Sequence, residues 1–340
     1  MSESNVRIGV VGLGHWGPNL ARNFAQLPNS EVTWLCDGNP DALERQRLTH
    51  PSARLTGDIE DLLSDPELDA VVVAVPVPAH AAVAERVLAA GKHVFVEKPL
   101  GATLAEAERL VELSDASDRI VMVGHLLEYH PAVEHLKDLL AAGELGDVRY
   151  VYSTRLNLGK LRTDENALWS LGPHDVSVAL SLIGEDPSEI EAHGEAYMNP
   201  GVEDVVFGYL RFPSGVAAHM HLSWLDPHKQ RQITVVGSKR MATFDDMQIE
   251  GKLTIYDKGF DEDFKSYGEY LARSGDITMP RISNEEPLRI ECRHFVDCIV
   301  SGTTPRTDAH SGLRTVRVLE GMQHSLDAAR GVTEGAGAGV

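Results

Sequence analysis

The chain has 340 residues, of which 43% are hydrophobic and 24% charged, so it is long enough for two ordinary globular domains. Its formal net charge of −20 argues against nucleic acid or an anionic membrane surface as a partner. No apolar run approaches the ~20 residues of a membrane span, and residues 1–5 lack the basic and apolar regions of a secretory signal. Three cysteines without CxxC spacing predict a reduced, cytoplasmic protein with no disulfide and no metal site.

The first pattern along the chain is a glycine-rich turn between a strand and a helix. The apolar run Val6–Val11 is followed by Gly12-Leu13-Gly14-His15-Trp16-Gly17 and then by a helical pattern from Pro18 to Leu27. The next apolar run, Val32–Cys36, ends at Asp37. This order of strand, glycine turn, helix, strand and acid is that of a dinucleotide-binding unit, although such a turn can also serve helix packing alone. We predict cofactor contacts from Gly12, Gly14, His15, Trp16, Gly17 and Asp37.

Asp37 also bears on the choice of cofactor. A carboxylate here accepts hydrogen bonds from the adenosine ribose and repels a 2′-phosphate, and no basic residue follows in Gly38-Asn39-Pro40-Asp41. The sequence therefore favours NAD over NADP. The alternative is that Asp37 caps the helix that begins near Pro40.

Up to about residue 125 the chain alternates between strands and amphipathic helices. Near-continuous apolar strands indicate a parallel sheet buried on both faces, which predicts a Rossmann domain over residues 1–125. The predicted strands are Val6–Val11, Glu31–Cys36, Asp69–Val75, His93–Glu97 and Arg119–Val123, and the further helices are Asn39–Leu48, Ile59–Leu63, Pro78–Ala90 and Leu104–Ala116.

After residue 125 a succession of strands predicts a second α+β domain over 126–330, with a mainly antiparallel open sheet. Residues 267–287 look irregular, and the glycine- and alanine-rich tail 331–340 is expected to be disordered. The predicted helices are Pro131–Ala142, His174–Ile183, Pro287–Val300 and Ser311–Arg330. The predicted strands are Asp147–Arg155, Glu189–Ala196, Asp204–Phe212, Val216–Trp224, Arg231–Val236, Met241–Asp245 and Lys252–Tyr256.

A second signature is the strand that ends in Glu97-Lys98-Pro99-Leu100. Open α/β sheets bind ligands at the carboxyl edge of their strands, so a lysine pinned there by a proline is well placed for chemistry. Most lysines are nevertheless solvated surface charges.

The chain resembles the Gfo/Idh/MocA family, which includes glucose–fructose oxidoreductase and inositol dehydrogenase. The resemblance rests on the glycine motif, Val73-Ala74-Val75-Pro76 with His80, Glu97-Lys98-Pro99 and Gly172-Pro173-His174-Asp175, in family order over about residues 6 to 325. It implies an N-terminal Rossmann domain, a C-terminal domain whose open sheet often mediates oligomerisation, and NAD(P)-dependent chemistry at a sugar hydroxyl. A homodimer or homotetramer is expected.

The resemblance also implies roles for single residues. Lys98 would lie beside the nicotinamide and the reacting hydroxyl. The peptide bond between Lys98 and Pro99 is expected to be cis. His174 would be the acid/base, and Lys98 would orient the hydroxyl and stabilise developing alkoxide charge. Many members carry an aspartate four residues before this histidine, where this chain has Ser170. Further cofactor contacts are predicted from Val75, Pro76, His80 and Glu97.

The segment after the first strand of the second domain carries three basic residues, Arg155, Lys160 and Arg162. Arginine forks suit phosphate or carboxylate groups, and a protein of net charge −20 needs local positive charge to hold an anion. The segment resembles the family branch that oxidises UDP-linked amino sugars or uronates at C3. A solvated or subunit-contact loop is the alternative. The predicted substrate-binding residues are His125, Arg155, Asn157, Lys160, Arg162 and Asp175.

The two histidines His219 and His221 share one face of a strand, where a packing role outweighs metal binding because no third ligand is evident. Together the patterns predict NAD-dependent oxidation of a sugar hydroxyl, at C3 of a nucleotide-linked sugar, by Lys98 and His174. The alternatives are an NADP-dependent keto-sugar reductase, a free sugar or inositol dehydrogenase, and a non-catalytic dinucleotide-sensing regulator.

Overall fold

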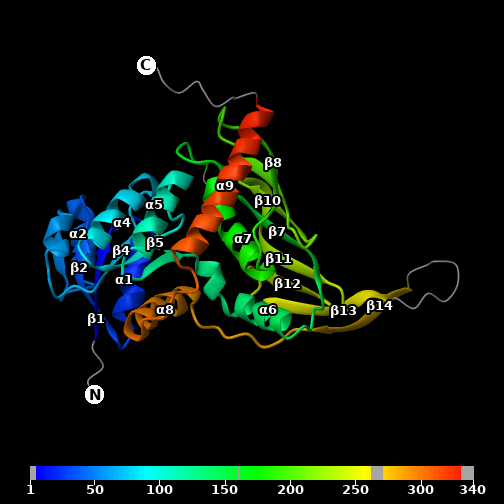
Figure 1. The fold of residues 1–340 in the computed structure, drawn as a ribbon, viewed down its shortest axis with the longest axis horizontal. Coiled ribbons are helices and arrows are strands. Elements are labelled where there is room, and N and C mark those ends of the chain that lie inside the picture. Colours follow the sequence, from blue (N-terminus) through cyan, green and yellow to red (C-terminus); the bar gives the residue numbers. More distant parts are fainter. Residues whose placement is uncertain (1–4, 160, 262–270, 331–340) are drawn as a thin grey trace. The chain divides into compact units, whose positions relative to one another are not determined.

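The computed structural model describes residues 5–159, 161–261 and 271–330, which divide into two compact units, each with its own sheet (Figure 1). The first unit comprises Met1–Tyr129 and Glu285–Arg317, and the second His130–Asn284 and Val318–Val340. The predictions for Lys160 and for the tail 331–340 fall outside the described residues.

The first unit contains a six-stranded parallel sheet in the order β3-β2-β1-β4-β5-β6, as the predicted Rossmann domain requires. Strands β1, β4, β5 and β6 are buried along nearly their whole length, which explains their continuous apolar sequences. The edge strand β3 was not predicted, because its three residues pair only with β2 and carry no apolar run. The strands are β1 (Val6–Val11), β2 (Ser30–Cys36), β3 (Arg54–Thr56), β4 (Ala70–Val73), β5 (His93–Glu97) and β6 (Val121–Gly124).

Aromatic packing joins this sheet to its helices. Phe24 of α1, Phe95 of β5 and Phe295 of α8 are fully buried and meet edge to face, with ring centroids 5.7–6.2 Å apart. The helices are α1 (Gly17–Ala25), α2 (Pro40–Arg47), α3 (Ile59–Leu63), α4 (His80–Ala89), α5 (Leu104–Asp115) and α8 (Pro287–Ser301), with short 3-10 turns η1 (Val77–Ala79) and η2 (Leu126–Tyr129).

The return of residues 285–317 to the first unit differs from the predicted division at residue 125 into two continuous domains. The buried face of α8 packs on α1, and Glu286 pairs with Arg22 at 2.7 Å. Thr307 donates its hydroxyl to the Val123 carbonyl at 2.7 Å. A helical pattern alone does not tell which core a late helix joins, so the sequence could not predict this return.

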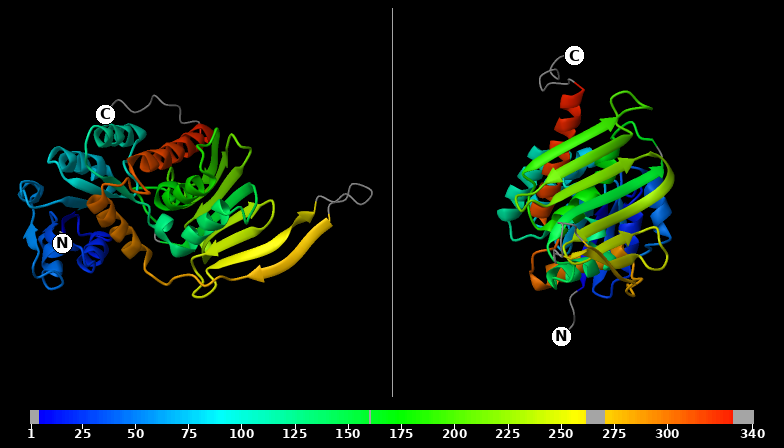
Figure 2. Two further views of the ribbon diagram at one scale, coloured as in Figure 1. Left: turned by 60° about the horizontal axis from the view of Figure 1, so that its bottom comes forward. Right: turned by 90° about the vertical axis from the view of Figure 1, so that its right-hand side faces the viewer.

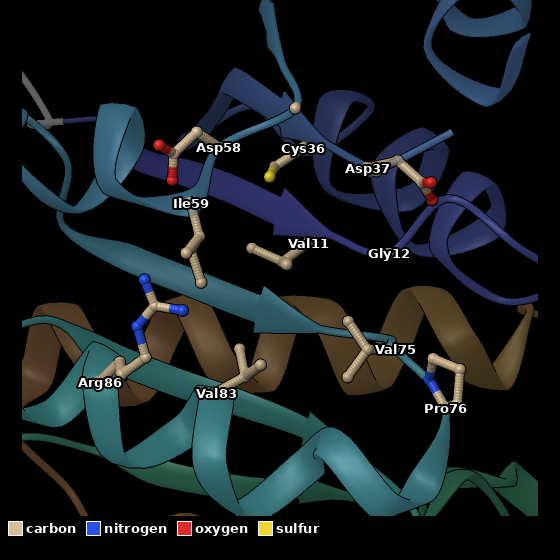
Figure 3. Close-up of a pocket in the computed structure, with 12 residues that line it drawn as sticks. Val11, Gly12, Cys36, Asp37, Asp58, Ile59, Val75, Pro76, Val83 and Arg86 are labelled. Atoms are coloured by element: carbon tan, nitrogen blue, oxygen red, sulfur yellow. The ribbon is translucent and has the colours of Figure 1, made fainter. Parts of the chain in front are cut away.

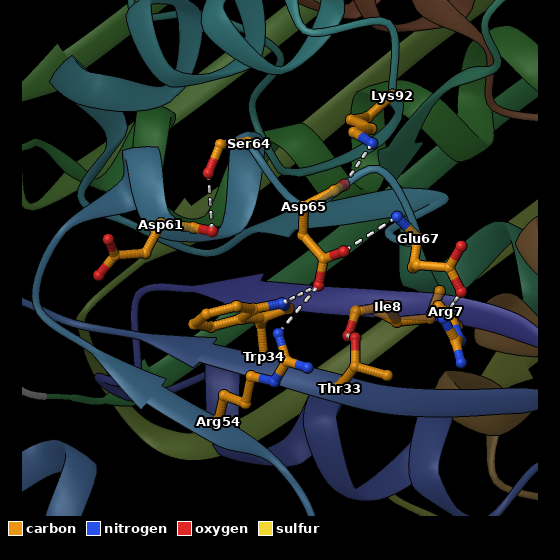
Figure 4. Close-up of polar contacts among 10 residues, drawn as sticks. All are labelled: Arg7, Ile8, Thr33, Trp34, Arg54, Asp61, Ser64, Asp65, Glu67 and Lys92. Atoms are coloured by element: carbon orange, nitrogen blue, oxygen red, sulfur yellow. Dashed lines mark hydrogen bonds and ion pairs between the residues drawn. The ribbon is translucent and has the colours of Figure 1, made fainter.

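The amino edge of the first sheet is held by a polar network around Asp65 (Figure 4). Its carboxylate accepts hydrogen bonds from the Trp34 indole at 2.8 Å and from the Glu67 amide at 2.9 Å, and the Lys92 ammonium donates to its carbonyl at 2.8 Å. The Trp34 hydrogen bond, followed by that of Glu67, lowers the pKa of Asp65. This edge is therefore closed by internal contacts, which leaves the opposite, carboxyl edge as the place for a ligand.

The second unit contains an eight-stranded sheet in the order β14-β13-β12-β11-β7-β10-β9-β8, antiparallel except for β7 and β10 (Figure 2). It matches the predicted open sheet with two corrections. Strand β14 lies in the stretch predicted as irregular, and β11 begins at Leu225, well before the predicted Arg231, with a shift of its register with β7 between Leu225 and Gln230. The strands are β7 (Val148–Leu158), β8 (Glu189–Glu195), β9 (Val205–Arg211), β10 (Ala217–Ser223), β11 (Leu225–Gly237), β12 (Met241–Asp245), β13 (Leu253–Asp261) and β14 (Leu271–Thr278).

One face of this sheet is covered by helices, namely α6 (Pro131–Ala141), α7 (Ala167–Ile183) and the second-unit part of α9 (Ala309–Ala329) (Figure 1). Met322 of α9 lies so close that a Cβ on Gly208 would stand 2.7 Å from its methyl carbon. Side chains on the other face are more exposed, including Tyr150 at 40% and Phe207 at 51%. None of the described helices combines the length and apolar character that crossing a bilayer needs.

Candidate active site

The glycine turn after β1 shows which of its glycines the backbone needs. Gly12 has φ +91°, and a Cβ on it would lie 2.5 Å from the Ala74 carbonyl oxygen. On Gly17 a Cβ would lie 1.8 Å from the Gly12 carbonyl oxygen, whereas on Gly14 it would meet no atom within 4 Å. Gly12 and Gly17 therefore make the tight turn and the close helix approach, and Gly14 borders open space where a ligand could come close to the backbone.

Helix α1 begins in the same turn with its amino end free for an anion. Trp16, the residue before it, makes no side-chain capping bond, and the first turn carries no acidic residue. The orphan amide groups and the helix dipole favour a negatively charged group there. This end fits the pyrophosphate of a dinucleotide, with the exposed His15 and half-buried Trp16 beside it.

A cavity of about 430 Å³ opens at the carboxyl ends of β1 and β2 (Figure 3). Asp37 stands at its edge, and its two carboxylate oxygens accept the backbone amides of Leu13 at 2.6 Å and Asn39 at 2.7 Å. These contacts fix the carboxylate of Asp37 next to the glycine turn. The lining residues are Val11, Gly12, Cys36, Asp37, Gly38, Gly57, Asp58, Ile59, Val75, Pro76, Val83 and Arg86.

Asp37 does not cap the helix that follows it, which corrects the alternative interpretation. The cap of α2 is Asn39, whose side-chain oxygen accepts the Asp41 amide at 3.0 Å. Much of the cavity wall was not predicted from the sequence. Val83 and Arg86 lie three residues apart on α4, so helical periodicity could have placed them on one face. Arg86 pairs with Glu60 at 2.5 Å.

The Glu97-Lys98-Pro99 turn ends strand β5 in the same unit, and its Lys98–Pro99 bond is cis. Glu97 is buried, and burial raises its carboxyl pKa to about 7 against the opposing charge of Lys98. His125, just after β6, is 0% exposed, and burial and then the Lys98 charge lower its pKa to about 3. Within the described residues neither ring nitrogen of His125 has a hydrogen-bond partner. A neutral imidazole and a buried carboxyl thus flank the predicted catalytic lysine.

His80 is buried and is not among the residues that line the cavity. Its Nδ1 is 2.8 Å from the Pro99 carbonyl oxygen and its Nε2 is 2.9 Å from the Val75 carbonyl oxygen. This differs from the predicted cofactor-binding role, because both ring nitrogens already contact backbone. Val75 and Pro76, by contrast, line the cavity as a cofactor contact would require.

His174 lies on α7 of the second unit, whereas Lys98 belongs to the first. The helix begins at Ala167 rather than at His174, because the Asn166 side chain caps it by accepting the Trp169 amide at 3.1 Å. Pro173 is tolerated inside the helix. The half-buried His174 therefore stands in the middle of α7, one turn after Ser170.

The two described arginines of the basic segment, Arg155 and Arg162, both form ion pairs with acidic side chains. Arg155 and Asp175 form a buried ion pair between β7 and α7, with side chains 9% and 1% exposed. The exposed Arg162 contacts Asp164 at 2.8 Å and Glu165 at 3.0 Å. Arg155 and Asp175 neutralise each other, and their substrate-binding roles stay predictions. Asn157 is half-buried on β7.

The paired histidines of β10 take part in ring stacking. His219 stacks on Tyr152 with centroids 5.3 Å apart, and His221 stacks on Phe207 at 4.4 Å. No group of side chains suited to a metal ion occurs within the described residues. The stacking agrees with the packing interpretation of these histidines.

A parallel sheet with a glycine turn, an acid at its carboxyl edge and a lysine at the end of another of its strands defines a dinucleotide-dependent oxidoreductase. Comparison with known proteins agrees: residues 6–125 match the "Oxidoreductase family, NAD-binding Rossmann fold", and residues 133–243 match the "GFO/IDH/MocA C-terminal domain". The chain belongs to the Gfo/Idh/MocA family. It is an NAD(P)-dependent oxidoreductase that acts on CH–OH groups.

Relatives include enzymes for different substrates. The chain is 29% identical over 261 residues to UDP-N-acetylglucosamine 3-dehydrogenase of Acidithiobacillus ferrooxidans, covering 75% of this chain and 78% of that one. It is 25% identical to scyllo-inositol 2-dehydrogenase (NAD(+)) of Bacillus subtilis, covering 89% of each. A solved structure of a putative oxidoreductase from Magnetospirillum magnetotacticum is 32% identical, with a TM-score of 0.81 over 94% of this chain and all of that one.

Proposed function

We propose that this protein oxidises a secondary hydroxyl of a sugar ring and passes the hydride to NAD. The observation that carries the proposal is the first unit's combination of the Gly14 opening, the uncapped amino end of α1 and the fixed carboxylate of Asp37. These three features fit the pyrophosphate and the ribose of one dinucleotide.

The preference for NAD over NADP rests on the charges around the cavity. Asp37 and Asp58 both line it, and a 2′-phosphate would face their negative charge. Arg86, the cation among the lining residues, is engaged by Glu60. A 2′-phosphate therefore finds no uncommitted arginine in this lining.

In this mechanism the bound NAD supplies the hydride acceptor. The amide groups of the glycine turn and α1 would hold the pyrophosphate, and Asp37 would accept hydrogen bonds from the ribose hydroxyls. Lys98 orients the substrate hydroxyl and stabilises the alkoxide charge, and His174 takes the hydroxyl proton. Ser170 cannot serve as the charged partner of His174, so the imidazole acts without a carboxylate one turn before it.

The substrate we propose is a nucleotide-linked sugar oxidised at C3, supported by the likeness to UDP-N-acetylglucosamine 3-dehydrogenase. A cyclic polyol is the second candidate. It is favoured by the pairing of Arg155 with Asp175 and of Arg162 with Asp164, which leaves neither guanidinium unmatched for a phosphate, and by the likeness to scyllo-inositol 2-dehydrogenase.

The test is NADH formation from NAD with UDP-N-acetylglucosamine, UDP-glucuronate, the free sugars and the inositols, each at matched concentration. We expect NADH with the UDP-sugars and at least tenfold less with the free sugars. NADH from an inositol but from no UDP-sugar would select the second candidate. NADPH consumption with a keto-sugar and no NADH with any alcohol would mean a reductase, and dinucleotide binding without turnover on the panel would favour a regulator.

We propose further that two copies pair through the open face of the second unit's sheet. Exposed Tyr150 and Phe207, with the stacked Tyr152 and His219, give this face an aromatic character that a second copy would cover. Sedimentation should show a dimer or tetramer, and Phe207→Asp should shift it toward the monomer. A monomeric wild-type protein would contradict this.

A further inference from the structure

We propose that His80 is a positioning residue, which fixes the backbone at Lys98 relative to the wall of the dinucleotide cavity. The inference rests on the proposed function for the role of Lys98. It assigns His80 no contact with substrate or cofactor.

The imidazole of His80 bridges two segments of the first unit. Nδ1 lies 2.8 Å from the carbonyl oxygen of Pro99, and Nε2 lies 2.9 Å from the carbonyl oxygen of Val75. Both distances lie within hydrogen-bond range; a neutral ring makes one of the two bonds at a time, and a protonated ring makes both. The ring is 1% exposed, so water does not compete for either carbonyl.

The two bridged residues stand at the two functional places of the unit. Val75 lines the dinucleotide cavity, and Pro99 directly follows Lys98. The ring sits on the first residue of α4, which carries Val83 and Arg86 of the same cavity further along. One side chain thus ties the cavity wall, the helix and the lysine turn together.

The chemistry of the ring selects this role over ligand binding. Both partners are carbonyl oxygens, which only accept, so each bond needs an N–H from the ring. A neutral imidazole donates to one carbonyl, and a protonated ring donates to both. In neither state does a ring nitrogen stay available for a ligand in the cavity.

Substitutions of His80 can keep one of its two backbone hydrogen bonds and remove the other. In His80→Asn the amide nitrogen has the place of Nδ1 and can donate toward Pro99. In His80→Gln the longer chain carries the nitrogen to the place of Nε2, toward Val75. His80→Phe keeps a ring of similar shape without either donor.

A matched control exists at the opposite end of β5. The Nδ1 of His93 accepts the Ile120 amide at 2.9 Å, which is also a ring-to-backbone contact, but it lies at the amino end of the strand that Lys98 follows. His93→Phe should affect stability as His80→Phe does without changing the lysine turn.

The experiment is hydrogen exchange of residues 97–102 in the full-length protein, together with titration of NAD. We expect exchange in His80→Phe to be about tenfold faster than in the wild type, and NAD to bind more weakly by a few-fold to tenfold. His80→Asn should restore the protection of residues 97–102, whereas His93→Phe should leave protection and NAD binding unchanged.

Unchanged exchange in His80→Phe would overturn the inference, as would equal changes in His80→Phe and His93→Phe. If His80→Phe does not fold, exchange in His80→Gln decides, and wild-type protection of residues 97–102 in it contradicts the role of the Pro99 contact. Because exchange is measured without cofactor, failure of the wild type to bind NAD would reject the proposed function alone.

Discussion

Two buried carboxylates, one in each unit, differ in how their charge is compensated. In the second unit, Asp175 is paired with the buried Arg155. In the first unit, Glu291 of α8 is 1% exposed, and within the described residues neither of its oxygens has a hydrogen-bond partner. Burial, and then the charges of Glu97 and Glu128, raise the pKa of Glu291 well above its usual range.

The difference is that the buried carboxylate of Asp175 has a guanidinium partner, whereas that of Glu291 has none within the described residues. Unmatched groups in the first unit include Glu291, the ring of His125 and the amino end of α1. Buried groups with strongly shifted pKa values occur more often at functional sites than in purely structural regions. In the first unit two of these groups lie near the Glu97–Lys98 turn, since the charge of Lys98 acts on His125 and that of Glu97 acts on Glu291.

The largest expected effect comes from breaking the matched pair. Arg155→Met leaves Asp175 charged and buried without its partner, which should lower the free energy of unfolding by about 3–5 kcal/mol. Chemical denaturation of the wild type, Arg155→Met and the double variant Arg155→Met/Asp175→Leu measures this. The double variant should recover most of the loss, and no recovery would mean that the pair is not what Arg155 supports.

Neutralising the unmatched carboxyl should have the opposite sign. Because the folded-state pKa of Glu291 is raised, the folded protein keeps a proton that the unfolded chain releases. The contribution of Glu291 to stability is therefore fully present below the unfolded-state pKa and is lost as the pH rises through the folded-state pKa. Glu291→Gln should therefore be more stable than the wild type at about pH 8, by about 1–3 kcal/mol, and the gain should shrink toward pH 5. Thermal unfolding across this range, with Glu31→Gln as an exposed control, would contradict the comparison if Glu291→Gln were less stable at every pH.

Removing the acid at the cavity edge should change cofactor choice rather than stability. Asp37→Ser removes the ribose acceptor and the charge that repels a 2′-phosphate, so NAD should bind about tenfold more weakly and the preference over NADP should narrow. Fluorescence titration with both dinucleotides measures this. A wild-type protein that prefers NADP would contradict the account of Asp37.

The smallest structural change, Gly14→Ala, should affect NAD binding but not stability. A Cβ on Gly14 meets no protein atom, so Gly14→Ala should leave the melting temperature unchanged while NAD binding weakens about tenfold. Gly17→Ala is the contrast, because its Cβ would overlap the Gly12 carbonyl and should reduce stability as well. Unaltered NAD binding in Gly14→Ala would place the pyrophosphate elsewhere.

The features that sequence predicted well are those that depend on neighbouring residues. The glycine turn, the place of Asp37 after β2 and the strand that precedes Lys98 follow from local backbone demands and from alternating elements. Pro173 misled the prediction of α7, because proline favours a helix start, while the true cap was Asn166.

Pairing across the fold could not be predicted in the same way. Arg155 and Asp175 are 20 residues apart on a strand and a helix, and nothing in either segment says that they meet. Nor does composition show that α8 returns to the first sheet or that His80 lies between two carbonyls. Each depends on tertiary packing that single-sequence patterns do not contain.

The central claim is that the first unit binds NAD and presents Lys98 to the hydroxyl that is oxidised. The most direct measurement is the rate of NADH formation by the wild type and by Lys98→Met on the substrate found in the panel, with the affinity for NAD measured in parallel. We predict a loss of about 10²–10⁴ in kcat with NAD affinity changed only a few-fold. Wild-type turnover in Lys98→Met would contradict the account.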